Sequence, residues 1–246
     1  ASRTRGRVEL ADVALAFKEV ALRGDGNITF RYAGDQVTLG NVVLVMDDGS
    51  RAALKGGLSA RALDLDLDLR SDLGVARWFI GGLKEAYGPI NLHLGITGSP
   101  ASPVLVGQGR LENGHFAVDG FRHAFNRVDT NIAFVRDRIL LDPLTFALDD
   151  SPVKGRGEVT LKGFALDHVT LAIRFQDLRF RVPDYLPSRL SGALTFSGNG
   201  KDFLVAGDVD VLEARYMDPW DWERLTVDFR RRRLAPGGAR RVGRDL

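Results

Sequence analysis

The stretch LDLDLDLR, residues 63–70, alternates four leucines with three aspartates and an arginine. Successive side chains of an extended strand point to opposite faces. This spacing would therefore place Leu63, Leu65, Leu67 and Leu69 on one face and every charged side chain on the other. The stretch predicts a β-strand with one aliphatic face and one charged face that is exposed to solvent.

The same alternation recurs along most of the chain, for example at residues 28–32, 92–96, 144–148 and 169–175. These apolar segments follow one another at the spacing typical of all-β proteins and predict roughly 16 to 20 short strands. The connections between them are short, and glycine is frequent, with 28 residues among 246. Short connections favour antiparallel pairing. The sequence therefore predicts an all-β fold in a mostly antiparallel sheet.

Two segments break the alternation. Residues 71–88 carry apolar side chains at helical spacing, although Gly81 and Gly82 weaken a helix there. Residues 181–192 contain two prolines and can hold at most one turn of helix. We therefore expect one short helical insert, at residues 71–88, within the sheet.

Internal repetition indicates how the sheet is built. Residues 46–60 resemble residues 148–161, and residues 106–118 resemble residues 206–217, at an offset of about 100 residues. Such repeats predict one continuous segment over residues 1–246 that grows by adding strands. Its expected divisions are approximate repeats at 5–105 and 106–205, a partial repeat at 206–230, and a basic tail at 231–246.

A long sheet with one apolar face needs a cover for that face, because a large exposed apolar surface marks a site of interaction. We expect the sheet to curl into a taco-like groove whose lining binds apolar cargo. An ordinary sandwich core is the alternative interpretation of the same side chains. The candidate lining residues are Leu63, Leu65, Leu67, Leu69, Leu92, Leu94, Ile96, Ile132, Phe134, Leu144, Phe146, Val169, Leu171, Ile173, Phe175, Leu194 and Phe196.

Charge and composition narrow the possible partners. The net charge of +2 does not support general nucleic-acid binding, and the basic residues gather in the C-terminal tail. We interpret that tail as a solvated segment, with contact to anionic lipid or to an acidic protein surface as the alternative. We expect no nucleic acid among the partners.

The residues that carry chemistry in enzymes are sparse here. The chain has no cysteine, and its four histidines do not stand at metal-ligand spacing, so we expect them at the surface or in turns. The pairs Asp47–Asp48 and Asp149–Asp150 are interpreted as turn residues whose carboxylates accept backbone N–H groups, rather than as a catalytic pair. We therefore expect no enzyme activity, no catalytic residue, no metal site and no cofactor.

Three longer stretches together resemble a known family. They are residues 88–121 (GPINLHLGITGSPASPVLVGQGRLENGHFAVDGF), residues 131–163 and residues 207–222. No single stretch is specific for the family, so the resemblance rests on the order in which the three stretches occur. Over residues 5–230 the chain resembles TamB, the translocation and assembly module subunit, within the wider AsmA-like group of bridge-like lipid transfer proteins.

This resemblance implies a periplasmic protein of Gram-negative bacteria that is tethered to the inner membrane by a segment absent from this chain. It implies a groove that conducts phospholipids between the inner and outer membranes, with phospholipid acyl chains as the bound partners. It also implies an outer-membrane Omp85-type partner, met through regions outside this chain. The family's N-terminal anchor and C-terminal domain are not evident in the sequence, so we expect an internal fragment, with membrane contact made elsewhere.

Two other functions remain open from the residues alone. The groove or the sheet edge could hold unfolded strands of outer-membrane barrel proteins, as a chaperone or scaffold does. A purely structural β-repeat module would instead close its apolar face into a core. What covers the apolar face decides among these three possibilities.

Overall fold

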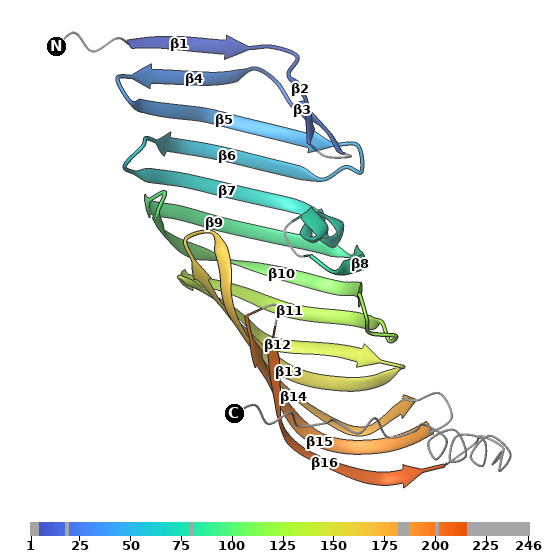
Figure 1. Cartoon of the computed structure of the whole chain (residues 1–246). Helices are drawn as coiled ribbons and strands as arrows, with labels where there is room; N and C mark the ends of the chain where they lie inside the picture. The colour runs from blue at the N-terminus through green and yellow to red at the C-terminus, as the bar shows by residue number, and fades with distance from the viewer. Residues whose placement is uncertain (1–4, 18–19, 79–80, 182–186, 200–201, 216–246) are drawn as a thin grey trace, which may run out of the picture.

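One continuous antiparallel sheet makes up almost the whole fold (Figure 1). The computed structural model describes residues 5–17, 20–78, 81–181, 187–199 and 202–215. Within them, 16 strands belong to a single sheet. The prediction of an all-β, antiparallel, curled sheet is confirmed.

The strands follow the chain closely. The N-terminal half contains β1 (Arg5–Leu10), β2 (Ala14–Phe17), β3 (Val20–Gly24), β4 (Ile28–Ala33), β5 (Gln36–Met46), β6 (Arg51–Leu58), β7 (Leu63–Asp72), β8 (Leu83–Tyr87) and β9 (Pro89–Ser99). The C-terminal half contains β10 (Ser102–Val118), β11 (Phe125–Arg136), β12 (Arg138–Leu148), β13 (Ser151–Lys162), β14 (Ala165–Arg181), β15 (Pro187–Gly198) and β16 (Phe203–Ala214).

The strand order is nearly that of a simple meander. From β4 to β16 each strand pairs with the next along the chain, apart from β8, and β1 pairs with β4 at one edge. The hairpin of β2 and β3 attaches to β5 through β3, and β8 attaches to the end of β10. These short local connections agree with the antiparallel arrangement that the turn spacing favours.

Strand register places the predicted lining on one face. Directly paired residues of an antiparallel sheet share a face. Leu67 pairs with Leu94, Leu94 with Gly107, Gly107 with Phe134 and Phe134 with Ile139. Followed from partner to partner in this way, all the candidate lining residues fall on the same side, which we call the apolar face.

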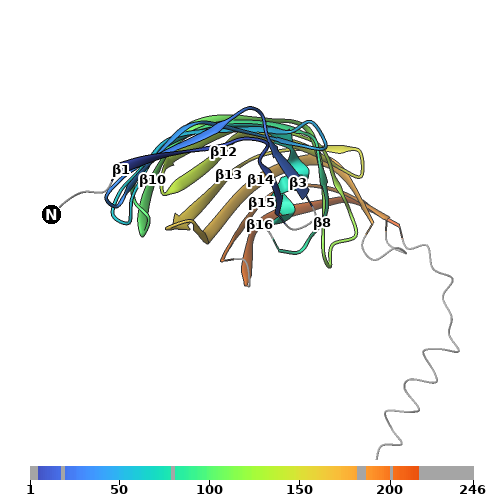
Figure 2. The ribbon, with the colours of Figure 1, turned by 90° about the horizontal axis from the view of Figure 1, so that it is seen from above.

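The apolar face lies on the inside of the curl. Seen from above, the sheet forms an arch with β3, β8 and the short helix η1 (Leu73–Trp78) beneath it (Figure 2). Leu73 of η1 packs against the large apolar cluster of the sheet, which identifies the concave side as the apolar face. The opposite side is called the convex face.

The aspartates of the opening stretch lie on the convex face. Asp64 and Asp68 are exposed and Asp66 is half-buried. The Lys55 Nζ lies 3.5 Å from the Asp66 Oδ1, and the His93 Nδ1 lies 2.8 Å from the Asp68 Oδ1. Such exposed ion pairs contribute at most about 1 kcal/mol each, so their main role is solvation of the outer surface. The prediction of a charged exterior is confirmed.

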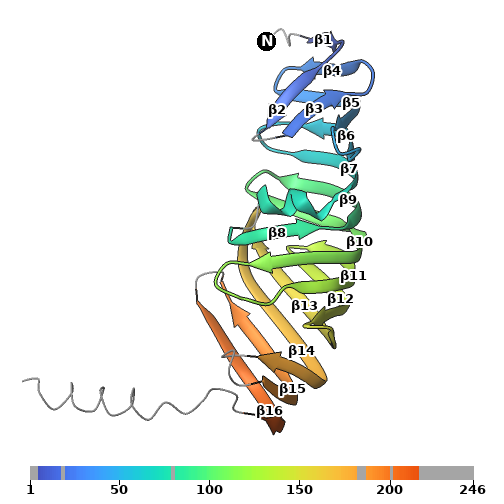
Figure 3. The same cartoon turned by 90° about the vertical axis from the view of Figure 1, so that its right-hand side faces the viewer.

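The expected helical insert at residues 71–88 is smaller than predicted. Among the described residues of the insert, 71–78 and 81–88, only η1 is helical, as a short 3₁₀ segment, and β8 follows it as a strand. The Asp72 Oδ1 accepts the Gly74 N–H at 2.8 Å and the Asp72 Oδ2 accepts the Gly88 N–H at 2.7 Å, which closes the insert into a compact loop beside the sheet (Figure 3). Residues 181–192 hold no helix where the structure describes them, in agreement with the expected limit of one turn, and β15 begins at Pro187.

Two apolar clusters stabilise the concave side. The smaller one has Ile28, Leu39 and Val42 as its buried members. The larger one spans β10 to β14, and its buried members are Leu111, Val128, Leu144, Phe146, Leu148, Val153, Phe175 and Leu178. Because no second sheet is present in the described part of the chain, these side chains are buried chiefly by one another across the curl.

Gly107 illustrates how the curl depends on a missing side chain. It stands on the apolar face between Leu94 and Phe134, and a Cβ there would overlap the His93 carbonyl oxygen and lie 2.9 Å from the Leu94 Cα. Gly107→Val should therefore lower the free energy of unfolding by about 1–3 kcal/mol, as overpacking does. Urea unfolding followed by circular dichroism measures this loss. Wild-type stability of the variant would show that β9 and β10 can separate freely.

The repeat boundaries and the basic tail are two features that the fold does not test. The repeat boundaries stay a prediction, and 105/106 and 205/206 fall inside β10 and β16. The basic tail at 231–246 lies outside the described residues. In the described part of the chain, no helix has the length and hydropathy needed to cross a membrane.

Candidate functional site

The apolar face divides into buried and partly exposed positions. Among the candidate lining residues, those below a tenth exposed are Leu94, Ile132, Leu144, Phe146 and Phe175. The others are half-buried: Leu63, Leu65, Leu67, Leu69, Leu92, Ile96, Phe134, Val169, Leu171, Ile173, Leu194 and Phe196. Register brings both groups onto one continuous face, but only the second presents its side chains to the concave space.

The two groups differ in what covers them. Leu144, Phe146 and Phe175 belong to the large apolar cluster and are covered by neighbouring side chains. The leucines of β7 are not among the buried core residues. Because the described strands form a single sheet, no second sheet faces the half-buried stretch from β7 to β9, although η1 and β8 lie beside it on the concave side. Together with the half-buried side chains of β14 and β15, this stretch is the part of the apolar face that can receive a ligand.

Several aromatic residues of the concave side were not among the predicted lining. Phe116, Phe121, Phe125 and Phe180 lie at the strand ends, and the ring centroids of Phe116 and Phe125 are 4.5 Å apart. The sequence feature that could have indicated them is the high density of aromatic rings in HFAVDGFRHAFN, residues 115–126. The apolar residues of this stretch do not alternate with polar ones. Register shifts between β10 and β11 break the period of two in this region.

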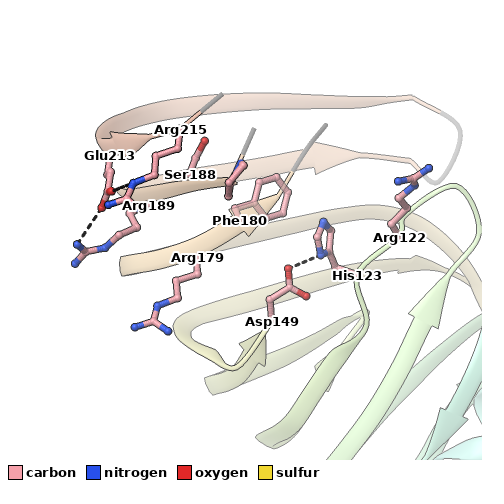
Figure 4. A pocket seen from close by; sticks show the side chains of 10 residues that line it. Arg122, His123, Asp149, Arg179, Phe180, Ser188, Arg189, Glu213 and Arg215 are labelled. Carbon is pink, nitrogen blue, oxygen red and sulfur yellow. Dashed lines mark hydrogen bonds and ion pairs between the residues drawn. The ribbon is translucent and has the colours of Figure 1, made fainter. Parts of the chain in front are cut away.

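These rings lead to a pocket at the strand ends, which we call the strand-end pocket (Figure 4). The cavity has a volume of about 930 Å³. Four arginines and two carboxylates line it, so its charge is predominantly positive. The lining residues are Arg122, His123, Asp149, Arg179, Phe180, Pro187, Ser188, Arg189, Glu213 and Arg215.

His123 is the buried polar group of this pocket. Its side chain is only 9% exposed, its Nδ1 lies 2.6 Å from the Asp149 Oδ2, and its Nε2 is buried without a hydrogen-bond partner. The ring centroid lies 4.7 Å from that of Phe180 and 5.4 Å from that of Phe121. His123 stands at a bend before β11, as the expectation of a turn histidine allows, but aromatic rings and a carboxylate enclose the imidazole instead of solvent.

His115 departs from the same expectation, and the aspartate pairs follow theirs only in part. The His115 side chain is 13% exposed and stacks on Tyr87 at 4.3 Å. Asp48 behaves as predicted, since its Oδ1 accepts the Ser50 N–H at 2.8 Å. Asp149 stands in the predicted turn, but its carboxylate binds His123 instead of the backbone.

An arginine network forms the outer wall of the pocket. The Arg189 Nε donates to the Asp177 Oδ1 at 2.5 Å, and the Arg215 Nε donates to the Glu213 Oε1 at 2.6 Å. The hydrogen bond from Arg189 lowers the pKa of the Asp177 carboxyl, so this carboxylate keeps its charge to a lower pH than usual. The Arg179 guanidinium makes no hydrogen bond or ion pair within the described ranges.

Three groups on the convex face lie close enough to share a cation. Ligand atoms of Asp66, Asp68 and His93 are all within 4.8 Å of one another. His93 is exposed, and Lys55 already neutralises Asp66. The ion pairs of the outer surface therefore account for this cluster.

One family model matches the chain. Residues 144–217, from β12 to the end of β16, match the model of the TamB C-terminal domain. The expectation that this domain is not evident in the chain is thereby corrected, and the resemblance to the family is confirmed over this segment. The family is associated with membrane-protein assembly or lipid transport in the Gram-negative envelope. No curated protein and no solved structure matches significantly.

Proposed function

We propose that this TamB-family chain is a segment of a conduit that carries phospholipids on its apolar face between the inner and outer membranes. Acyl chains would lie along the half-buried aliphatic side chains, with headgroups at the edge of the curl. The single observation that supports this most is the continuity of the apolar face, which strand register extends from β4 to β16 without a second sheet facing it in the described residues.

The chemistry of the face suits a hydrocarbon ligand. Leu63, Leu65, Leu67 and Leu69 stand at every second position of β7, and their partners on β9 include Leu92, Leu94 and Ile96. Each methylene buried against such a surface contributes about 0.8 kcal/mol, so ten contribute about 8 kcal/mol. Binding of this kind needs no specific polar group, and it permits movement along the sheet because successive rungs are chemically alike.

The proposal extends to location and partners. The protein would work in the periplasm, tethered to the inner membrane through a segment outside this chain, and would cooperate with an outer-membrane Omp85-type protein. It would act without a cofactor and without catalysis, because its task is to shield hydrocarbon from water. The family association with the envelope supports this placement.

A scaffold for barrel-protein assembly is the second candidate, and the edge strand β16 favours it. No described strand pairs with the outer side of β16, and apolar side chains on it are exposed, including Leu204 at 71% and Val211 at 63%. An unpaired strand edge can template another strand through main-chain hydrogen bonds. The nascent strands of an outer-membrane protein are the partners that this edge would fit.

Photocrosslinking distinguishes the two functions. A photoreactive side chain at Leu67, on the apolar face, should crosslink to phospholipid in cells, whereas the same group at Asp68 on the convex face should not. The lipid adduct is identified by mass spectrometry of the purified chain. Crosslinks from Leu67 to barrel proteins in place of lipid would refute the conduit and support the scaffold.

A further inference from the structure

We propose that the strand-end pocket binds the phosphate of a phospholipid whose acyl chains lie on the adjoining apolar face. This inference rests on the proposed function and adds a headgroup site to it. The conduit alone requires only an aliphatic surface. The strand-end pocket adds cationic groups at the place where that surface meets solvent.

The pocket is continuous with the apolar cluster. Phe180 lines the pocket and also packs against the large cluster, and His123 contacts both Phe180 and Phe121. Phe121 in turn stacks on Phe125, whose ring meets that of buried Phe146. A row of rings therefore joins the pocket to the hydrophobic interior. A lipid matches this arrangement, because its charged headgroup is joined directly to apolar chains.

The charge of the pocket selects an anion. Four arginines line the pocket with two carboxylates, a third carboxylate, that of Asp177, binds Arg189 beside it, and Glu213 is shared between Arg189 and Arg215. The Arg179 guanidinium makes no hydrogen bond or close ion pair in the described part of the chain, and its charge also acts on the nearby Asp177 carboxylate. Guanidinium groups hold phosphate oxygens through two parallel hydrogen bonds. A phosphate ester would balance the excess of positive charge.

His123 gives the pocket a second, independent mark of a ligand site. Its Nδ1 is held by Asp149, while its Nε2 is buried and lacks a partner. Figure 4 shows the imidazole with one nitrogen toward Asp149 and the other turned away from it. An unsatisfied buried polar atom costs about 1–3 kcal/mol. With Nδ1 turned to Asp149, Nε2 is the ring atom left for a ligand, and a phosphate group would supply its missing partner.

The test compares two short-chain lipids that differ only in the phosphate. Isothermal titration calorimetry with monomeric dihexanoyl phosphatidic acid and with dihexanoylglycerol should give about tenfold tighter binding for the phosphatidic acid. Arg179→Gln and His123→Phe should each reduce that preference to about threefold or less. Phenylalanine keeps the ring contacts of His123 and removes its polar atoms. Arg156→Gln is the matched control, because Arg156 is exposed on the convex face of β13.

The outcomes separate the sources of the phosphate and the two proposals. Equal affinity for the two lipids would overturn the headgroup site and leave the conduit standing. Binding of inorganic phosphate as tightly as phosphatidic acid would overturn the lipid assignment, because the acyl chains would then contribute nothing. Binding of neither lipid would overturn the conduit and the headgroup site together. If both pocket variants keep the wild-type preference for phosphatidic acid over dihexanoylglycerol, the phosphate binds outside the strand-end pocket and the headgroup site is overturned.

Discussion

Leu171→Asp should strongly reduce phospholipid binding by a chain that remains folded. Leu171 is half-buried on the apolar face of β14, between Gly157 and Phe196 in the register. A carboxylate in contact with acyl chains loses its hydration without gaining a partner, which costs several kcal/mol. In the lipid-free chain the same carboxylate keeps part of its contact with water. The bound lipid should therefore fall by at least about tenfold while the fold persists.

Native mass spectrometry and lipid extraction of the purified variant measure this loss, and circular dichroism checks the fold. Ala172→Asp is the control, because Ala172 lies on the convex face opposite Arg156 and a carboxylate there meets a cation. The control should retain wild-type lipid. Leu94→Asp is a weaker test, because Leu94 is only 8% exposed and a charge there would also destabilise the lipid-free fold. Wild-type lipid content in Leu171→Asp would remove the apolar face from the transport proposal.

The strand content and the shared face were predictable because both follow from a period of two. LDLDLDLR needs only the alternation of a strand to separate its leucines from its aspartates, and β7 pairs without a register shift along its whole length. The same reasoning placed β9 and β14 on the sheet correctly. Alternation reports which side a residue occupies, but it does not report whether neighbouring side chains or solvent cover it. Which lining residues are buried and which are open therefore depends on how the sheet curls, and alternation does not predict that curl.

The strand-end pocket was less predictable for a different reason. Phe121 and His123 precede β11 in an irregular connection, so neither period nor motif spacing applies to them. Asp149 comes from the β12–β13 turn, and Arg189 comes from β15, far away in the sequence. Only the bending of the sheet brings these groups to one cavity. The contraction of the helical insert to η1 has a local cause, since the Asp72 carboxylate binds backbone N–H groups at both ends of the loop.

Phe175→Ala should destabilise the chain strongly, and it tests whether the C-terminal part of the apolar face is a closed core. Phe175 is 4% exposed and contacts the other members of the large cluster, with Val153 and Gly192 as its paired neighbours. Truncation of a buried phenylalanine lowers the free energy of unfolding by about 3–5 kcal/mol, because the cavity left behind adds to the lost burial. Phe164→Ala, at a residue 60% exposed, should change it by less than about 0.5 kcal/mol.

The measurement of Phe175→Ala is urea unfolding of delipidated chain, with and without added phospholipid. If Phe175 belongs to a packed core, the loss of stability is the same in both conditions, and lipid binding persists on the open stretch of β7 and β9. If lipid instead reaches Phe175, added phospholipid fills the cavity and restores much of the lost stability. A small loss in the lipid-free chain would contradict the packed cluster itself. The conduit would then extend unbroken from β7 to β15, instead of passing over a core that Leu144, Phe146 and Phe175 close.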